Sequence, residues 1–271
     1  MTTKLFIALF VFLGLFTCSK PPKYKQEYYD LPKIDTNAYN QCLIRYKTNS
    51  YDNNILLTLK LKVVYLKPLS LSSYFESTLA TDSVIINNLN ISYKEQGIQF
   101  YLEESSITRG DYFINDFMQH NKEFETKDRI TLLIYESTEN ASYNGVANGI
   151  PGTVAGAIIT RIGTATIPHE IGHTLGLKHV FEKDDTDGKN HITGDEVCDT
   201  GSYNIMDHRT HNCGYTGTAD YTEEDLKVLI PNTLNYSYEE IDCRNKFTPI
   251  QNLRIRWFIE KYPTLSDALY Y

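Results

Sequence analysis

Residues 169–179 are HEIGHTLGLKH, and this stretch decides how the rest of the chain is interpreted. His169 and His173 are four residues apart, so on a helix both side chains point from one face toward a common ion. Glu170 follows the first histidine and falls beside the pair. The spacing therefore predicts a metal site with a carboxylate next to it.

A glycine and a third histidine complete this site. Gly176 can take the positive φ that commonly ends a helix, and the chain can then turn and bring His179 to the same ion. Three histidine nitrogens at about 2.0–2.1 Å leave one position of tetrahedral zinc open, as in catalytic zinc sites. Glu170 is then placed to take a proton from a zinc-bound water and pass it to a leaving amine. We expect zinc on His169, His173 and His179.

The same eleven residues reproduce the signature H-E-x-x-H-x-x-G-x-x-H, and the chain thereby resembles the metzincin metalloproteases. The resemblance implies a zinc endopeptidase with a methionine turn beneath the metal, downstream of the third histidine. Met206, in the stretch YNIMDH at 203–208, is the candidate, because the other methionines are Met1 and Met118. Taken alone, a buried methionine is more often plain core filler.

Three further stretches resemble the pappalysin-like (cytophagalysin) group: GDEVCDT at 194–200, NIMD at 204–207 and CRNKFTPIQ at 243–251. Many such proteins have a tyrosine two residues after the methionine, where it can hydrogen-bond the tetrahedral oxyanion. His208 stands there in this chain, either as an oxyanion donor with a pH dependence that tyrosine lacks or as a bystander. Gly201 stands where the group usually has proline, so the group's side-chain preference is not carried over.

Length and charge limit the class of protein. The 271 residues fit one catalytic domain of two lobes after removal of a targeting segment. A formal net charge of −8, with no basic block, argues against nucleic acid as a partner.

The N-terminus predicts export. Lys4 precedes an apolar run at residues 5–16 that is too short to span a bilayer. Leu15 and Cys18 are spaced as in a bacterial lipobox, although the two residues between them are larger than usual. We expect a signal peptide at 1–17 and a lipid on Cys18, which would anchor the protein to a membrane of the bacterial cell envelope. The alternative is an ordinary secretory signal cut nearby, which would give a secreted protein.

The other four cysteines are an even number, which suits an oxidising compartment. We expect disulfides between Cys198 and Cys213 and between Cys42 and Cys243, with Cys198–Cys243 nearly as plausible. A different hypothesis makes Cys42 a latency thiolate on the zinc.

The remaining pattern predicts an α/β (α+β) fold of the metzincin-like zincin type. Its parts are a tether or short pro-region at 18–50 and a catalytic domain at 51–271. The upper lobe, about 51–179, is expected to hold a twisted mixed sheet and the active-site helix, and the lower lobe, about 180–271, to be mainly helical or irregular. Alternation of apolar and polar residues predicts strands near 57–63, 98–102, 129–135 and 153–160, and a helix at 82–93 capped by Asp82.

Two local features bear on the site. The strand at 153–160 is expected at a sheet edge, where free N–H and C=O groups bind an extended peptide, the alternative being a covered strand. Pro168 fits only the first turn of a helix, so the zinc helix should run from Thr166 as N-cap to Leu177. The acidic residues of 184–199 could hold Ca²⁺, although a solvated loop suits their spacing better.

The sequence thus predicts a zinc-dependent endopeptidase acting on a peptide or protein, with Glu170 as general base and acid. A non-catalytic surface binding protein or adhesin with the same fold is the main alternative, against which Glu170 argues, because binding needs no base. An enzyme acting on a non-peptide amide or ester is a third possibility. The oligomeric state is not predicted.

Overall fold

The computed structural model describes most of the chain, and the statements below concern the described residues only. These are 36–51, 54–69, 78–137, 140–181, 194–200, 210–211, 214–215, 221–236 and 243–271. The predictions for Cys18, Met206, His208, Cys213 and residues 184–193 lie outside them.

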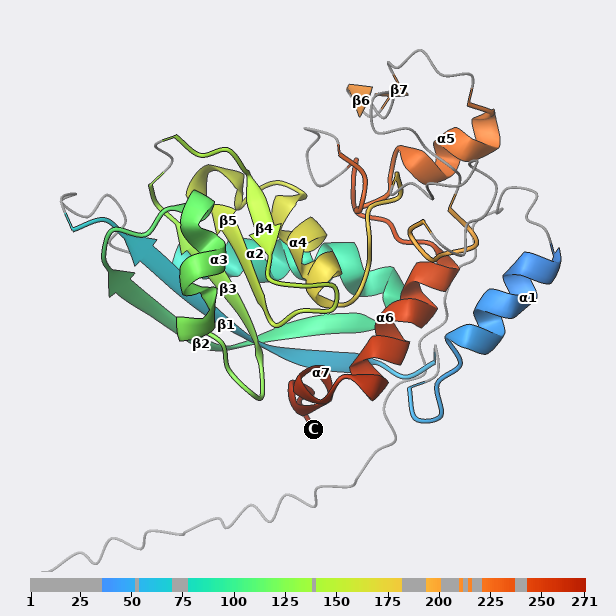
Figure 1. Cartoon of the computed structure of the whole chain (residues 1–271), viewed down its shortest axis with the longest axis horizontal. Helices are drawn as coiled ribbons and strands as arrows, with labels where there is room; N and C mark the ends of the chain where they lie inside the picture. Colours follow the sequence, from blue (N-terminus) through green and yellow to red (C-terminus); the bar gives the residue numbers. More distant parts are fainter. Residues whose placement is uncertain are drawn as a thin grey trace, which may run out of the picture.

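A five-stranded sheet forms the centre of the fold (Figure 1). Its strands, in spatial order, are β2 (Ile98–Arg109), β1 (Leu57–Lys67), β3 (Ile130–Tyr135), β5 (Val154–Ile158) and β4 (Gly145–Ala147). The first four are parallel to one another, and β4 is antiparallel to β5. The mixed sheet of the predicted fold class is confirmed, and β3 is buried along its whole length, as its apolar sequence requires.

The edge strand differs from the prediction. Gly156 of β5 pairs with Leu133 on one side and with Val146 on the other, so β5 is covered on both sides. The prediction of an edge strand at 153–160 is therefore wrong, and among the described strands β4 forms this edge of the sheet. Three residues are too few to show an alternating pattern, which is why the sequence did not indicate β4.

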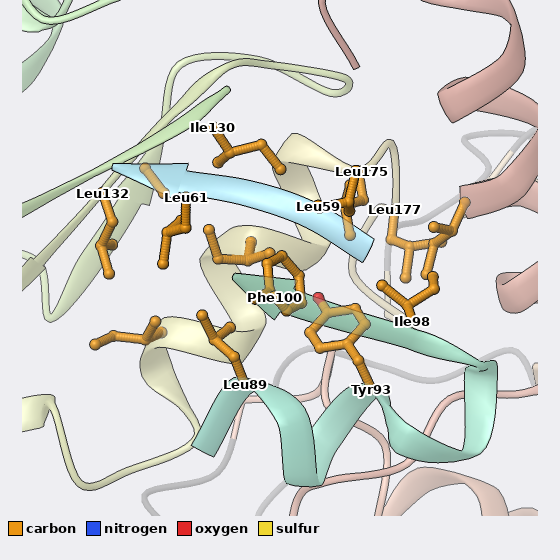
Figure 2. Close-up of a cluster of buried hydrophobic side chains, with 14 of the residues drawn as sticks. Leu59, Leu61, Leu89, Tyr93, Ile98, Phe100, Ile130, Leu132, Leu175 and Leu177 are labelled. Atoms are coloured by element: carbon orange, nitrogen blue, oxygen red, sulfur yellow. The ribbon is translucent and has the colours of Figure 1, made fainter. Parts of the chain in front are cut away.

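Helix α2 (Thr78–Tyr93) and helix α4 (Thr166–Thr174) cover one face of the sheet, and α3 (Phe117–His120) lies on the other (Figure 1). Leu89 and Tyr93 of α2 point into the same core as Leu59 and Leu61 of β1, and all four are fully buried (Figure 2). The predicted helix is confirmed but begins four residues earlier. Asp82 accordingly lies inside it and does not cap it.

The remaining strands and α-helices follow α4 in the chain, except for α1, which lies near its start. They are β6 (Thr210–His211), β7 (Gly214–Tyr215), α5 (Glu223–Leu229), α6 (Pro249–Lys261) and α7 (Pro263–Asp267). Capping boxes at Thr222 and Thr248 begin α5 and α6. None of the helices in the described ranges is long and apolar enough to cross a membrane.

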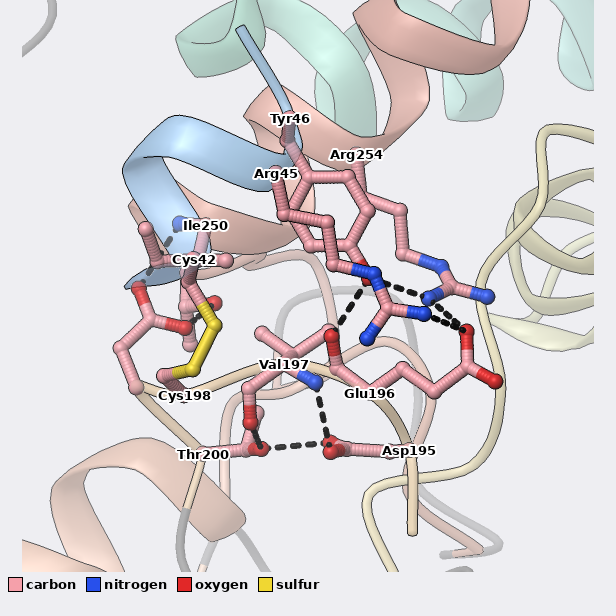
Figure 3. The surroundings of a disulfide bond; sticks show 12 residues. Cys42, Arg45, Tyr46, Asp195, Glu196, Val197, Cys198, Thr200, Ile250 and Arg254 are labelled. Carbon is pink, nitrogen blue, oxygen red and sulfur yellow. Dashed lines mark hydrogen bonds and ion pairs between the residues drawn. A yellow bond between two sulfur atoms is a disulfide. The ribbon is translucent and has the colours of Figure 1, made fainter. Parts of the chain in front are cut away.

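Helix α1 (Thr36–Arg45) lies in the segment predicted to lack regular structure. Cys42 is disulfide-bonded to Cys198, and both sulfurs are buried beside Val197 and Ile250 (Figure 3). The expected pairings of these two cysteines are therefore wrong, as is the latency hypothesis for Cys42. Sequence spacing does not show that α1 packs against residues 194–200, and that packing decides the pairing. Cys243 is also disulfide-bonded.

Two side chains, Tyr46 just after α1 and Arg254 of α6, connect α1 to the turn after the zinc helix (Figure 3). The Tyr46 hydroxyl donates to the Glu196 carbonyl at 2.6 Å, and Arg254 Nη1 donates to Tyr46 Oη at 2.6 Å. Arg254 is almost fully buried, and its Nε donates to the Gly176 carbonyl at 2.6 Å. Because Gly176 follows α4 directly, this network fixes the turn that carries the third histidine.

Candidate metal centre and active site

Helix α4 places the first two histidines. Thr166 is its first helical residue and not its N-cap, and Pro168 lies in the first turn as predicted. The helix ends at Thr174, earlier than predicted, because Gly176 takes φ +94°. The N–H groups of Gly176 and Leu177 then donate to the carbonyls of His173 and Gly172, which is the Schellman motif.

This turn brings three histidines together. The Nε2 atom of His173 lies 3.1 Å from the Nε2 atoms of His169 and His179, which are 3.2 Å from each other. His169 and His173 are buried and His179 is half-buried. Three imidazoles cannot all satisfy one another at such distances, whereas one cation at about 2.0–2.1 Å from each nitrogen fits them. Among the described residues, no other group of three histidine, cysteine or carboxylate side chains lies close enough together to hold a metal ion.

Backbone carbonyls fix the two buried rings. His169 Nδ1 lies 2.8 Å from the Thr233 carbonyl, and His173 Nδ1 lies 2.7 Å from the Leu177 carbonyl. A carbonyl only accepts, so His173 Nδ1 carries the hydrogen and its Nε2 lone pair is free for a metal, and the Thr233 carbonyl favours the same tautomer of His169. Burial also lowers the pKa of His169, and the neighbouring His173 adds to this effect. The ring is therefore kept in the neutral form that binds a metal.

Glu170 follows His169 on α4 and occupies a desolvated position. Its side chain is buried, and burial raises its pKa to about 8, an effect that the charge of Arg244 opposes. No described side chain donates a hydrogen bond to its carboxylate. Strand β4 lies directly against it, at Gly145. Such a carboxyl, shielded but not committed to a partner, suits proton transfer.

Residues 232–236, which the sequence analysis did not assign to the site, form the turn that packs against α4. Leu234 is fully buried, and its Cδ2 lies 3.0 Å from where a Cβ at Gly172 would be. The ring centre of Tyr236 lies 4.6 Å from that of His179 and 5.7 Å from that of His169. Tyr236 remains 45% exposed, so it borders the open side of the cluster.

A sequence signal for this turn exists. Residues 232–236 are NTLNY, and residues 204–208 are NIMDH, so both follow an asparagine–x–apolar pattern. The first has leucine where the second has methionine, ends in tyrosine and lies shortly before Cys243. Met206 and His208 lie outside the described residues, so their predicted roles stay predictions.

Arg244 is a second residue that the sequence analysis missed. It is buried, and its Nη2 donates to the Thr233 carbonyl at 2.7 Å, the same oxygen that faces His169 Nδ1. Arg244 Nη2 lies 2.8 Å from that Nδ1, so both nitrogens converge on one acceptor. The guanidinium thus holds the carbonyl that orients a metal ligand.

Calcium gains no support from the described acidic residues. Asp195 accepts hydrogen bonds from the Val197 N–H and the Thr200 hydroxyl. Asp199 accepts from the Thr248 hydroxyl and the Ile250 N–H at the start of α6. Both carboxylates are buried and serve the packing of the 194–200 segment on α6.

Comparison with solved structures places this fold. A promirolysin mutant from Tannerella forsythia is similar with a TM-score of 0.56 and 16% identity, over 84% of this chain and 88% of that one. Metalloproteinase-II from Bacteroides fragilis (TM-score 0.33, 18% identity, 51% of this chain and 47% of that one) is more distant. Archaemetzincin from Methanopyrus kandleri is also more distant, with a TM-score of 0.32 and 14% identity over 45% of this chain and 76% of that one. The fold is that of a metzincin-like metalloprotease.

A comparison of the sequence with models of protein families identifies a peptidase family. Residues 153–260 match the sequence model of the peptidase family described as Pregnancy-associated plasma protein-A. A direct comparison with curated proteins gives no match. The matched residues include the three histidines, the turn at 232–236 and most of α6. The predicted resemblance to the pappalysin-like metzincins is confirmed.

Proposed function

We propose that this chain hydrolyses peptide bonds with zinc on His169, His173 and His179 and with Glu170 as general base and acid. The observation that carries the proposal is the convergence of three histidine Nε2 atoms, with the buried Glu170 next to His169 on the same helix. When bound, zinc supplies the charge that activates a water, polarises the scissile carbonyl and lowers the pKa of the neighbouring carboxyl.

The protein's own groups perform the proton transfers. Glu170 takes a proton from the attacking water and returns it to the leaving amine. The Thr233 and Leu177 carbonyls keep His169 and His173 in the Nδ1–H tautomer throughout. Burial excludes bulk water from Glu170, so the proton passes between the reacting groups.

Tyr236 is the described residue best placed to stabilise the oxyanion. Its ring packs beside His179 and stays partly exposed, so its phenol can donate to a substrate held at the cluster. The Asn235 side chain accepts from the Tyr236 N–H at 2.8 Å and donates to the Leu229 carbonyl, which holds the tyrosine's backbone in place. His208, an oxyanion donor or a bystander on the sequence alone, is the other candidate for this role. Comparing Tyr236→Phe with His208→Ala separates the two assignments.

An extended peptide is the substrate form that suits the sheet edge. Strand β4 pairs only with β5 among the described strands, and its residues are half-exposed. We propose that the substrate adds to β4 as a further strand.

We propose export and lipid attachment at Cys18, on the sequence of residues 1–18 alone. The tether is then shorter than predicted, about 18–35, because α1 is bonded to the folded domain through Cys42. A membrane fraction that loses the protein in a Cys18→Ala variant would support the anchor, and an unchanged distribution would contradict it.

A mixed peptide library tests the activity. The soluble chain, residues 19–271, is incubated with the library in parallel with Glu170→Ala and with a zinc chelator. Products that vanish in both controls support the proposal. Absence of cleavage by a zinc-loaded, oxidised protein, also after trimming of residues 19–35, would favour the surface binding protein.

A further inference from the structure

We infer that Gly145 of edge strand β4 is a positioning residue for Glu170, whose carboxylate occupies the space that a side chain at position 145 would need. A Cβ built on Gly145 would lie 2.6 Å from both Cγ and Oε1 of Glu170. It would also lie 2.8 Å from Cγ2 of Thr166. The inference rests on the role proposed for Glu170.

The backbone of Gly145 has little freedom to move away. It is paired in the sheet with Ala157. Just before β4, the Asn144 carbonyl accepts from the Ile158 N–H. Just after β4, the Asn148 N–H donates to the Val154 carbonyl. Its φ lies outside the left-handed region, so alanine fits its backbone conformation. A methyl group there would therefore clash with side chains of the neighbouring helix α4 and would not strain the backbone of Gly145.

The backbone that carries Glu170 is held as well. The Tyr93 hydroxyl donates to the Pro168 carbonyl at 2.9 Å, and the histidines on both sides of Glu170 in the helix are fixed by carbonyls. The Glu170 side chain must therefore absorb the overlap. To regain a contact of 3.0–3.4 Å, its Cγ and Oε1 must shift by roughly 0.4–0.8 Å.

Such a shift acts on the chemical step. A misplacement of about 1 Å costs on the order of 100-fold in rate, so we expect kcat to fall by about 10- to 100-fold. The N–H and C=O groups of β4 keep their positions, so substrate binding at this edge, and KM with it, should change by less than about threefold.

The test compares Gly145→Ala with Gly163→Ala. Gly163 is a matched control, because a Cβ there would meet no atom within 4 Å and its φ is also outside the left-handed region. We measure kcat, KM, zinc content and Tm of both variants. The inference predicts a 10- to 100-fold lower kcat for Gly145→Ala with one zinc retained, and no change for Gly163→Ala. A kcat within twofold of the control would overturn it.

A second comparison separates Glu170 from Thr166. The Gly145→Ala/Thr166→Ser double variant removes the Cγ2 methyl but keeps the overlap with Glu170. We expect kcat to stay low. Recovery to the level of Thr166→Ser alone would assign the effect to Thr166 and overturn the inference.

A thermal cycle tests the contact without any activity measurement. Gly145→Ala should lower Tm in the wild-type background and lower it less in a Glu170→Ala background, where only the overlap with Thr166 remains. Equal decreases of Tm in both backgrounds would contradict the contact. This comparison can be made even if Gly145→Ala is too unstable for an activity assay. A wild-type protein that binds zinc but cleaves nothing would refute the proposed function, and this cycle would still test the contact.

Discussion

Removing the Cys42–Cys198 disulfide should lower the stability of the chain without changing its chemistry. The two cysteines are 156 residues apart in sequence. The loss of chain entropy in the unfolded state gives an upper value of about 5 kcal/mol for a loop of this size, and native disulfides typically contribute about 2–5 kcal/mol. Since a folded domain is stable by only about 5–15 kcal/mol, this is a large share of the total.

Guanidinium unfolding of Cys42→Ala/Cys198→Ala against the wild type measures the loss. We expect about 2–5 kcal/mol, or a Tm lower by about 5–15 °C. Neither cysteine contacts a histidine of the cluster, so kcat well below Tm should be unchanged. A loss under about 1 kcal/mol, or alkylation of Cys42 in the unreduced wild type, would refute the reasoning.

Three further predictions concern the site and its support. Tyr236→Phe should lower kcat by about 10- to 1,000-fold with little change in zinc content, because it removes one oxyanion donor; an unchanged kcat would exclude the phenol. Leu234→Ala should cost about 2–5 kcal/mol in chemical unfolding, because the side chain is fully buried against α4; a loss under about 1 kcal/mol would contradict that packing. Raising the pH from about 6.5 to 8 should lower the unfolding free energy of the chelated, metal-free chain, measured by denaturation at each pH. Burial raises the pKa of Glu170 and Asp195 to about 8 and that of Asp199 to about 7, so the folded state keeps protons that the unfolded chain has lost. A flat or rising profile would contradict these shifts.

Local sequence was enough for the zinc helix and the sheet interior. The i, i+4 histidines and the helix-ending Gly176 depend on neighbours in the chain, and the structure brings these groups together as their spacing predicts. The apolar run of β3 likewise predicts a central strand, because burial on both faces allows no polar alternation.

Contacts between distant segments could not be predicted in this way. The pairing of Cys42 depends on where α1 packs, and the edge position of β4 depends on which strand β5 accepts as its last neighbour. Both are set by tertiary packing and leave no local pattern.

The turn beneath the site shows a different difficulty. Met206 matches the expected motif by identity, and its predicted role stays a prediction because residue 206 lies outside the described residues. The turn that packs against α4 in the described structure carries Leu234, an apolar side chain of similar volume. Leucine is too common to mark such a turn, so the sequence did not indicate Thr233 and Tyr236, which lie beside the histidines.

The central claim is that the three histidines hold a zinc ion that is required for peptide hydrolysis. The most direct measurement is the hydrolysis rate of a peptide taken from the library, followed while zinc is titrated back into the chelated chain. The account predicts no activity without metal and a rate that rises in proportion to zinc up to one equivalent. Activity that survives complete removal of metal, or one bound zinc per chain without any hydrolysis, would contradict it.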